Sequence, residues 1–177
     1  MQDQGVGAVV TKTISSVGAK VPRPCIYGNK YFIMNSELWS EHPKEVWLNE
    51  ILPGYDKSDG RPLIISVGYT KDDVGMLVPL LEPFADAFEV STHYVGKDLS
   101  VIQETVRTIR RKTNKPVYMK ISPNMDDPVA FAEAVREAGA SGIAAINSLG
   151  PTLKIDIHSR QIVYGGESGF VWTSGPA

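Results

Sequence analysis

Cysteine is almost absent from this chain of 177 residues, in which Cys25 is the sole example. A single cysteine excludes an internal disulfide and any metal site that needs several thiolates. A chain without disulfides is expected in the cytoplasm, where thiols stay reduced. Histidine is also scarce, with three copies, and His42 and His158 are isolated in polar surroundings. We therefore expect no metal site.

Long apolar runs and an excess of charge are missing too. No run approaches the roughly 20 apolar residues of a membrane-spanning helix, and the N-terminus lacks the basic and apolar regions of a signal peptide. The net charge is −2, which gives no electrostatic reason to expect nucleic acid or a membrane surface as partner. With 42% hydrophobic and 21% charged residues, the composition is that of a globular protein, and a small molecule is the expected partner.

The chain does contain a regular alternation of β-rich runs and amphipathic stretches. The apolar runs are 8–14, 62–68, 87–92, 116–121 and 142–147. Between the later runs, apolar residues recur at helical spacing in three stripes: Val74, Leu77, Val78 and Leu81; Leu99, Ile102, Val106 and Ile109; Val129, Ala132, Val135 and Ala138. This order predicts βαβ units and a parallel sheet with both faces covered.

Two segments interrupt the alternation. Residues 15–60 form a long insertion after the first strand, with a short helix expected at 43–52. Residues 148–177 form a tail, in which 153–157 and 161–164 are expected to pair as a hairpin. We expect residues 1–177 to form one domain.

Polar residues stand where four of the five predicted strands end. Lys12 and Thr13 lie at the end of the first run, and Lys120 lies at the end of the fourth. Ser91 and Thr92 end the third, and Asn147 and Ser148 end the fifth. Because the carboxyl ends of parallel strands meet at one edge, a shared electron-rich or anionic ligand is one interpretation. The alternative is that each lysine extends outward and pairs with a surface carboxylate.

The motifs at these strand ends resemble a known family. Residues 7–13 (GAVVTKT), 35–36 (NS), 120–124 (KISPN) and 146–150 (INSLG) resemble the class 1 dihydroorotate dehydrogenases. Residues 34–38 (MNSEL) and 164–169 (YGGESG) resemble the related domain of dihydropyrimidine dehydrogenase. The resemblance implies an α/β fold of the (β/α)8 TIM-barrel type. It supplies about five βα units, similar to strands two to six, so the barrel is incomplete.

The resemblance also implies a cofactor, FMN, and roles for particular residues in pyrimidine metabolism. Lys120 would contact the pyrimidine edge of the flavin, and Thr13 and Asn147 would also contact the cofactor. Lys12 would lie near both flavin and substrate. Asn35, Asn147 and Ser148 would hydrogen-bond a planar pyrimidine, whose edge both donates and accepts.

One loop departs from the family pattern. After the fourth barrel strand the family has approximately Asn-x-Ser-Cys-Pro-Asn, in which the cysteine is the base, whereas this chain has Ser91-Thr92-His93-Tyr94-Val95-Gly96. Both asparagines are replaced, and Cys25 is far away in sequence. Tyr94, with an ordinary pKa near ~10, suits an acid that protonates carbon during alkene reduction. His93, with an ordinary pKa of about 6.5, is the other catalytic candidate.

Three functional hypotheses follow. The first is an FMN-dependent oxidoreductase that transfers hydride between flavin and a pyrimidine-like ring. The second is a non-catalytic, degenerate barrel that serves as a structural or binding subunit. The third is a (β/α) enzyme for a phosphorylated metabolite without flavin. A barrel of five units lacks the phosphate loops that follow strands seven and eight. We therefore expect missing barrel segments or a homo-oligomer.

Overall fold

The computed structural model describes residues 5–68, 70–92, 96–163 and 169–175. Its centre is a five-stranded sheet in which every neighbouring pair is parallel, in the order β1-β4-β5-β6-β7. The strands are β1 (Val9–Val10), β4 (Leu63–Val67), β5 (Ala87–Ser91), β6 (Val117–Lys120) and β7 (Gly142–Ala144). The prediction of consecutive parallel strands is confirmed.

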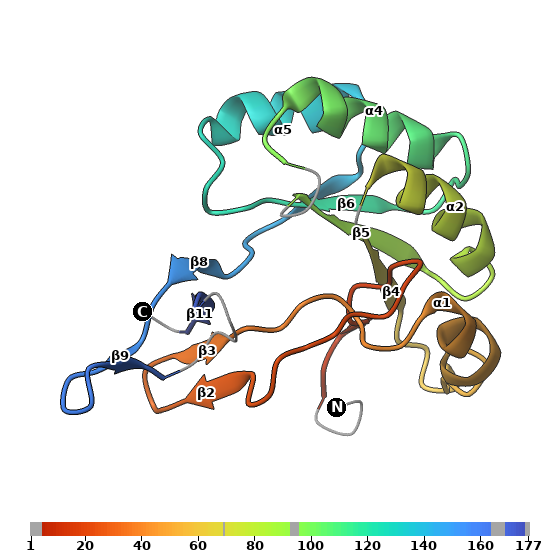
Figure 1. The fold of residues 1–177 in the computed structure, drawn as a ribbon. Helices are drawn as coiled ribbons and strands as arrows, with labels where there is room; N and C mark the ends of the chain where they lie inside the picture. The colour runs from red at the N-terminus through yellow and green to blue at the C-terminus, as the bar shows by residue number, and fades with distance from the viewer. Residues whose placement is uncertain (1–4, 69, 93–95, 164–168, 176–177) are drawn as a thin grey trace.

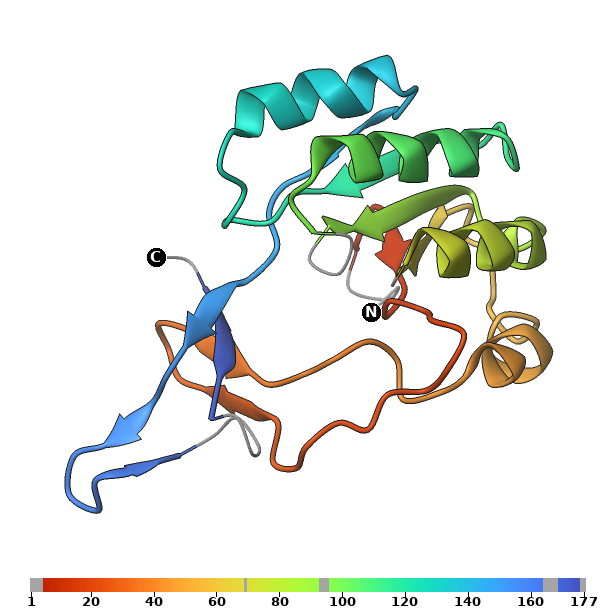
Figure 2. The ribbon, with the colours of Figure 1, turned by 45° about the horizontal axis from the view of Figure 1, so that its top comes forward.

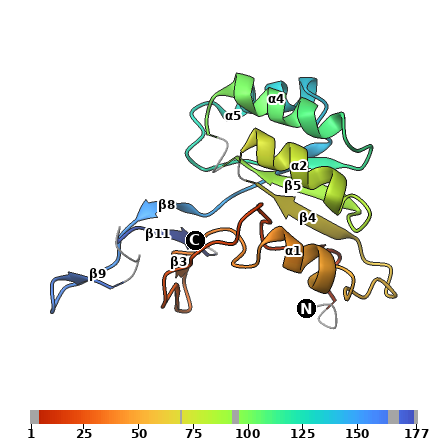
Figure 3. The same ribbon diagram turned by 45° about the vertical axis from the view of Figure 1, so that its right-hand side comes forward.

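Three helices cover one face of this sheet, as Figures 1 and 3 show from two sides. They are α2 (Lys71–Leu81), α4 (Leu99–Arg110) and α5 (Pro128–Glu137). A hydroxyl or carboxylate starts each helix, because the first backbone N–H groups need acceptors. Thr70 and Asp73 form a reciprocal capping box at α2, and Asp98 and Asp127 accept backbone N–H groups at α4 and α5.

The apolar stripes of α2 and α4 are buried as predicted at Val74, Leu77, Val78, Leu81, Ile102, Val106 and Ile109. The stripe of α5 was predicted correctly at Val135 and Ala138, which are buried, and wrongly at Val129. Val129 is 69% exposed, whereas Phe131, Ala134 and Val135 are buried. Both sets recur at helical spacing, so the pattern alone does not choose between them. Phe131 decides the orientation because a buried aromatic ring removes far more apolar surface from water than valine does.

The two faces of the parallel strands differ sharply in chemistry. The face toward the helices is apolar and buried, at Leu63, Ile65, Val67, Phe88, Val90, Val117 and Met119. At its carboxyl end the opposite face is polar, and Ser66, Glu89, Ser91 and Lys120 lie on it. The sequence predicts mostly apolar strands covered on both faces, whereas at this end of the sheet the face away from the helices carries polar side chains that line a cavity. A polar interior face is what a ligand-binding barrel requires.

A second sheet is built from the insertion and the tail together. Its antiparallel strands are β2 (Ile26–Gly28), β3 (Ile33–Asn35), β11 (Val171–Ser174) and β8 (Leu149–Thr152), in that order. Strand β3 pairs with β11, 137 positions apart at Asn35 and Trp172. Figure 2 shows this sheet as an arm that projects from the parallel sheet.

The remaining elements also match expectation. The predicted hairpin is confirmed, since β9 (Ile155–Asp156) pairs antiparallel with β10 (Gln161–Ile162) at the tip of the arm. The helix expected at 43–52 is present as α1 (Lys44–Val46) continued by η2 (Trp47–Ile51). Trp47 is buried there, and its indole N–H donates to the hydroxyl of Ser40 over 2.8 Å. No helix in the described ranges is long and apolar enough to span a membrane.

Candidate functional site

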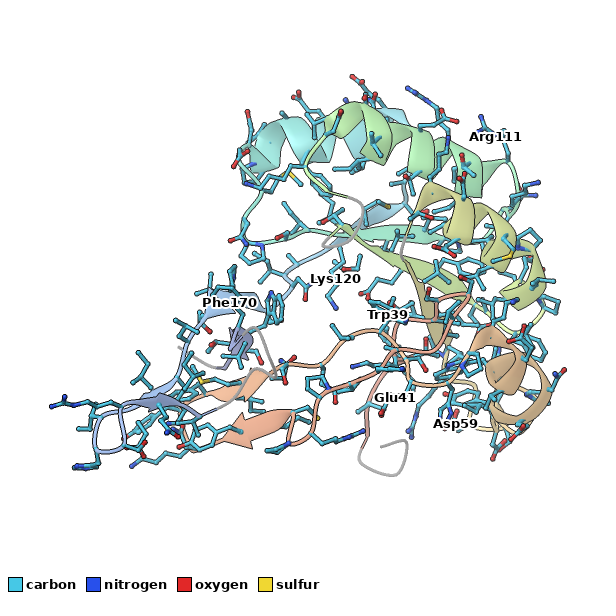
Figure 4. The ribbon with its side chains drawn as sticks, viewed as in Figure 1. Trp39, Glu41, Asp59, Arg111, Lys120 and Phe170 are labelled. Atoms are coloured by element: carbon cyan, nitrogen blue, oxygen red, sulfur yellow. The ribbon has the colours of Figure 1, made fainter. Side chains whose placement is uncertain are left out.

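A cavity of about 500 Å³ opens at the carboxyl ends of the parallel strands. That volume falls within the roughly 300–1,000 Å³ of small-molecule sites. It is lined by Val10, Thr11, Lys12, Thr13, Asn35, Glu37, Leu38, Trp39, Ser66, Glu89, Ser91, Lys120, Asn147, Ser148 and Trp172. In Figure 4, Lys120 extends from the parallel sheet toward the space above the segment that carries Trp39. Both sheets therefore contribute to the site.

The chain after β1 leaves the sheet briefly, and this detour places two of the lining residues. The N–H of Thr11 still donates to Ile64 over 3.0 Å, but the hydroxyl of Thr11 then accepts the N–H of Ser66, also over 3.0 Å. The ladder resumes at Ile14, whose N–H donates to Ser66 over 2.8 Å. The first strand is thus shorter than predicted, because a side chain replaces backbone pairing. Lys12 and Thr13 are left facing the cavity.

Lys12 is paired with a carboxylate inside the lining. Its ammonium group donates to Glu37, and the other oxygen of Glu37 accepts the thiol of Cys25 over 3.1 Å. The hydrogen bond from Lys12 lowers the pKa of the Glu37 carboxyl, with a smaller contribution from Cys25. The same contact to Glu37 raises the pKa of the buried Cys25 thiol, so this cysteine stays protonated. Cys25 itself does not appear in the described lining, and Glu37 is the lining residue that it contacts.

Lys120 belongs to a second, deeper network. Its Nζ lies 3.5 Å from Oε1 of Glu89, a residue that is only 8% exposed. The same oxygen accepts the hydroxyl of Ser66 over 3.2 Å, and Ser66 lies 3.0 Å from the hydroxyl of Thr13. Side chains from four neighbouring segments are therefore joined in one chain of polar contacts. Neither lysine follows the alternative of pairing outward with a surface carboxylate, because both partners line the cavity.

The asparagines and the serine predicted to bind substrate also line the cavity. Asn147 donates to the hydroxyl of Ser91 over 3.2 Å and accepts the N–H of Ser148 over 2.9 Å. Asn35 accepts the N–H of Glu37 over 3.2 Å, and its amide nitrogen lies 3.4 Å from the carbonyl of Trp172. These contacts fix the amide planes, so that each presents a defined edge to the cavity.

Within the described residues, the structure brings the predicted cofactor-binding and substrate-binding residues together in one cavity. All six cofactor and substrate candidates line the cavity: Lys12, Thr13, Asn35, Lys120, Asn147 and Ser148. The catalytic candidates His93 and Tyr94 lie outside the described residues. Sequence reasoning missed Glu37 and Glu89 as partners of the lysines. For Glu89 the sequence did offer a signal, because an acidic residue within the apolar run 87–92 is expected to be buried and therefore to need a positively charged or hydrogen-bonding partner.

The lining suits the ring end of FMN better than its phosphate end. Ammonium, amide and hydroxyl groups offer the mixture of donors and acceptors that the edge of an isoalloxazine needs. The lining has two cations, Lys12 and Lys120, and each is already paired with a glutamate. The described part of the lining therefore offers no free cation to a phosphate. In such barrels the phosphate is held by loops after strands seven and eight.

A parallel sheet with helices on one face and a ligand-sized cavity at its carboxyl ends is the arrangement found in (β/α) barrels. The family model of dihydroorotate dehydrogenase matches residues 1–173, and the chain belongs to that family.

Two curated relatives carry the same name, dihydroorotate dehydrogenase B (NAD(+)), catalytic subunit. The protein from Pyrococcus horikoshii is 30% identical over 178 residues, which cover 94% of this chain and 57% of the relative. The protein from Thermococcus kodakarensis is 32% identical over 178 residues, which cover 94% of this chain and 58% of the relative. The chain thus spans less than two thirds of the length of these relatives.

Proposed function

We propose that the chain is the substrate-facing part of an FMN-dependent oxidoreductase that transfers hydride between flavin and a pyrimidine-like ring. The observation that carries this proposal is the gathering of Lys12, Lys120, Asn35 and Asn147 around one cavity at the carboxyl ends of parallel strands. Membership of the dihydroorotate dehydrogenase family supports it. A cytoplasmic location and association with further barrel segments or a second copy belong to the same proposal.

When bound, FMN would supply the hydride chemistry. The residues of this chain would orient the flavin and the substrate ring and stabilise the reduced flavin. Lys120 and Thr13 would hold the pyrimidine edge of the flavin, where the ammonium charge stabilises the reduced, anionic ring. Asn147 would reach both flavin and substrate, and Asn35 and Ser148 would hydrogen-bond the substrate ring. Amides that both donate and accept suit a ring with alternating N–H and C=O groups.

The proton transfer that accompanies hydride transfer is proposed for the segment after β5. In this proposal Tyr94 or His93 exchanges the proton with a ring carbon. A phenol is a weak base at neutral pH and a serviceable acid, so Tyr94 favours reduction of an unsaturated ring over oxidation of a dihydropyrimidine. An imidazole works in either direction near neutral pH.

The charges of the lining favour a ring without a carboxylate. Glu37 pairs with Lys12 and Glu89 pairs with Lys120, so the four charged side chains of the lining sum to zero. A substrate carboxylate, as in dihydroorotate, would have to displace Glu37 from Lys12 or lie beside it. We therefore propose an uncharged pyrimidine as the preferred substrate, although the relatives are named for dihydroorotate.

The test uses protein expressed together with the natural sequence on either side of residues 1–177. Bound flavin is reduced without air, and uracil, thymine or orotate is added while the visible absorbance is followed. Recovery of oxidised flavin with an uncharged ring, and not with orotate, is expected. Recovery with orotate alone would make the preference for an uncharged ring wrong. A protein that binds no flavin would instead favour the alternative, a degenerate barrel with a structural or binding role.

A further inference from the structure

We propose that Glu89 is the counter-ion that holds Lys120 in place and thereby sets the reduction potential of the flavin. This inference rests on the proposed function, because it requires FMN to lie against Lys120. Glu89 lies on β5 and contacts Lys120 but not the reacting atoms. It is therefore a positioning residue. Glu89 is not among the residues to which the family resemblance assigns a role.

The burial of Glu89 is the first observation. Only 8% of the residue and 10% of its side chain are exposed, although it carries an ionisable group. Charged carboxylates are rarely buried to this degree unless they are paired, because desolvation of the charge is costly. The polar face of the parallel sheet, where Glu89 lies between Ser66 and Tyr118, gives it that partner.

The geometry of the partners is the second observation. Both Ser66 and Lys120 approach the same oxygen, Oε1, at 3.2 Å and 3.5 Å. Ser66 is itself buried and lies 3.0 Å from Thr13. The hydroxyl of Ser66 on β4 therefore fixes the carboxylate of Glu89, and this carboxylate holds Lys120 of β6 toward the centre of the sheet. Lys120 is not free to turn toward solvent without leaving a buried charge unpaired.

The contrast with the other lysine shows why this pair matters for a cofactor. The side chain of Lys12 is 40% exposed and that of its partner Glu37 is 25% exposed, so water screens that pair. The Lys120–Glu89 pair is the more buried of the two, and its charges act over a longer range in the lower dielectric. A flavin ring against Lys120 would therefore respond to Glu89 as well.

The sign of the effect follows from the charges. Lys120 stabilises the anionic reduced ring, and the negative charge of Glu89 offsets part of that stabilisation. Replacing Glu89 with glutamine keeps the shape and removes the offset, so the reduced form becomes more favourable. We expect Glu89→Gln to raise the reduction potential by about 30 mV, which corresponds to a tenfold change in the equilibrium of a two-electron couple.

The experiment measures the midpoint potential of bound FMN in protein expressed with its natural flanking sequence. Asp126→Asn is the matched control, since it removes the same charge from a side chain that is 81% exposed and pairs with Lys97. Ser66→Ala keeps every charge and removes the hydroxyl that fixes Glu89. Because Glu89 is then held less firmly beside Lys120, it offsets less of the lysine's charge. Ser66→Ala should therefore raise the potential by a smaller amount than Glu89→Gln, and Asp126→Asn should leave it unchanged.

The outcomes separate this inference from the proposed function. If the unaltered protein binds FMN and Glu89→Gln leaves the potential unchanged or lowers it, the role of Glu89 is wrong while the oxidoreductase proposal stands. If Glu89→Gln does not fold, an unchanged potential in Ser66→Ala overturns the inference. If the unaltered protein binds no FMN, the proposed function fails and this inference fails with it.

Discussion

At the scale of single residues, the cavity is defined by paired charges. The place of the two strand-end lysines in the site could be predicted from sequence, because a cation at the end of an apolar strand is costly to bury without a partner or a ligand. Their partners could not, since Glu37 is 25 positions from Lys12 and Glu89 is 31 positions from Lys120. Only the fold brings these side chains together. The sequence therefore predicts the donors of the site and not its electrostatic balance.

Replacing Lys120 with methionine tests the residue on which the cofactor proposal depends most. The loss of its charge should weaken FMN retention and lower the reduction potential, opposite in sign to the effect of Glu89→Gln. Lys97→Met is the control, because Lys97 is an exposed lysine that pairs with Asp126. Dialysis followed by absorbance measures retention. An unchanged potential in Lys120→Met would remove this lysine from the role assigned to it.

The Glu37–Lys12 pair predicts a pH dependence of stability. The pKa of Glu37 is below its ordinary value of 4.5, chiefly because of the hydrogen bond from Lys12. The unfolded chain therefore binds more protons there, and stability from this pair is present above pH 4.5 and lost as pH falls through the folded pKa. Glu37→Gln should cost up to about 1 kcal/mol at pH 7 and progressively less below pH 4.5. Urea unfolding across this range measures the difference, and a cost independent of pH would contradict it.

At the scale of elements, the buried stripes of α2 and α4 were predicted correctly, whereas that of the alanine-rich helix α5 was correct at Val135 and Ala138 and wrong at Val129. In α2, Val74, Leu77, Val78 and Leu81 form the stripe that is buried, and Met76 and Leu80 are left partly exposed. In α5, alanines occupy several faces, so the burial of Phe131 decides which face of the helix packs on the sheet. A rule based on spacing alone misses this, because it takes no account of residue size. Strand β1 ends early for a different reason. The hydroxyl of Thr11 accepts the backbone N–H of Ser66, which a carbonyl group of the neighbouring strand would otherwise accept. The spacing of apolar residues in the sequence does not predict this contact.

Two leucines of α2 offer a matched test of this packing. Leu77 is fully buried and Leu80 is 43% exposed, on the same helix. Leu77→Ala should lower the free energy of unfolding by about 2–5 kcal/mol, through lost burial and the cavity left behind. Leu80→Ala should change it by less than about 0.5 kcal/mol. Equal losses in the two variants, measured by urea unfolding, would show that the helix packs by another face.

At the scale of the whole molecule, the parallel sheet has two open edges. Within the described residues, β1 pairs only with β4 and β7 only with β6. Val10 is 48% exposed beside one edge, and Ile143 and Ile146 are 39% and 58% exposed beside the other. Unpaired strand edges with apolar side chains invite pairing with another chain or segment. This fits a chain that spans 57% and 58% of the length of its relatives.

Residues 1–177 expressed alone should therefore associate and should not retain FMN. Light scattering coupled to size-exclusion chromatography measures the mass over a range of concentrations. Ile143→Lys places a charge on the β7 edge, which should reduce association, whereas Val129→Lys adds the same charge on the exposed surface of α5 and should not. A stable monomer of the unaltered chain with one bound FMN would contradict the interpretation of the open edges.

The most direct test of the central claim is the FMN content of the protein purified with the natural sequence on either side of residues 1–177. The cavity that gathers Lys12, Lys120 and Asn147 predicts one FMN per chain, seen as flavin absorbance and recovered as FMN after denaturation. Lys120→Met should lose most of that flavin on dialysis. A colourless protein that takes up no FMN on reconstitution would contradict the assignment of this cavity as a flavin site.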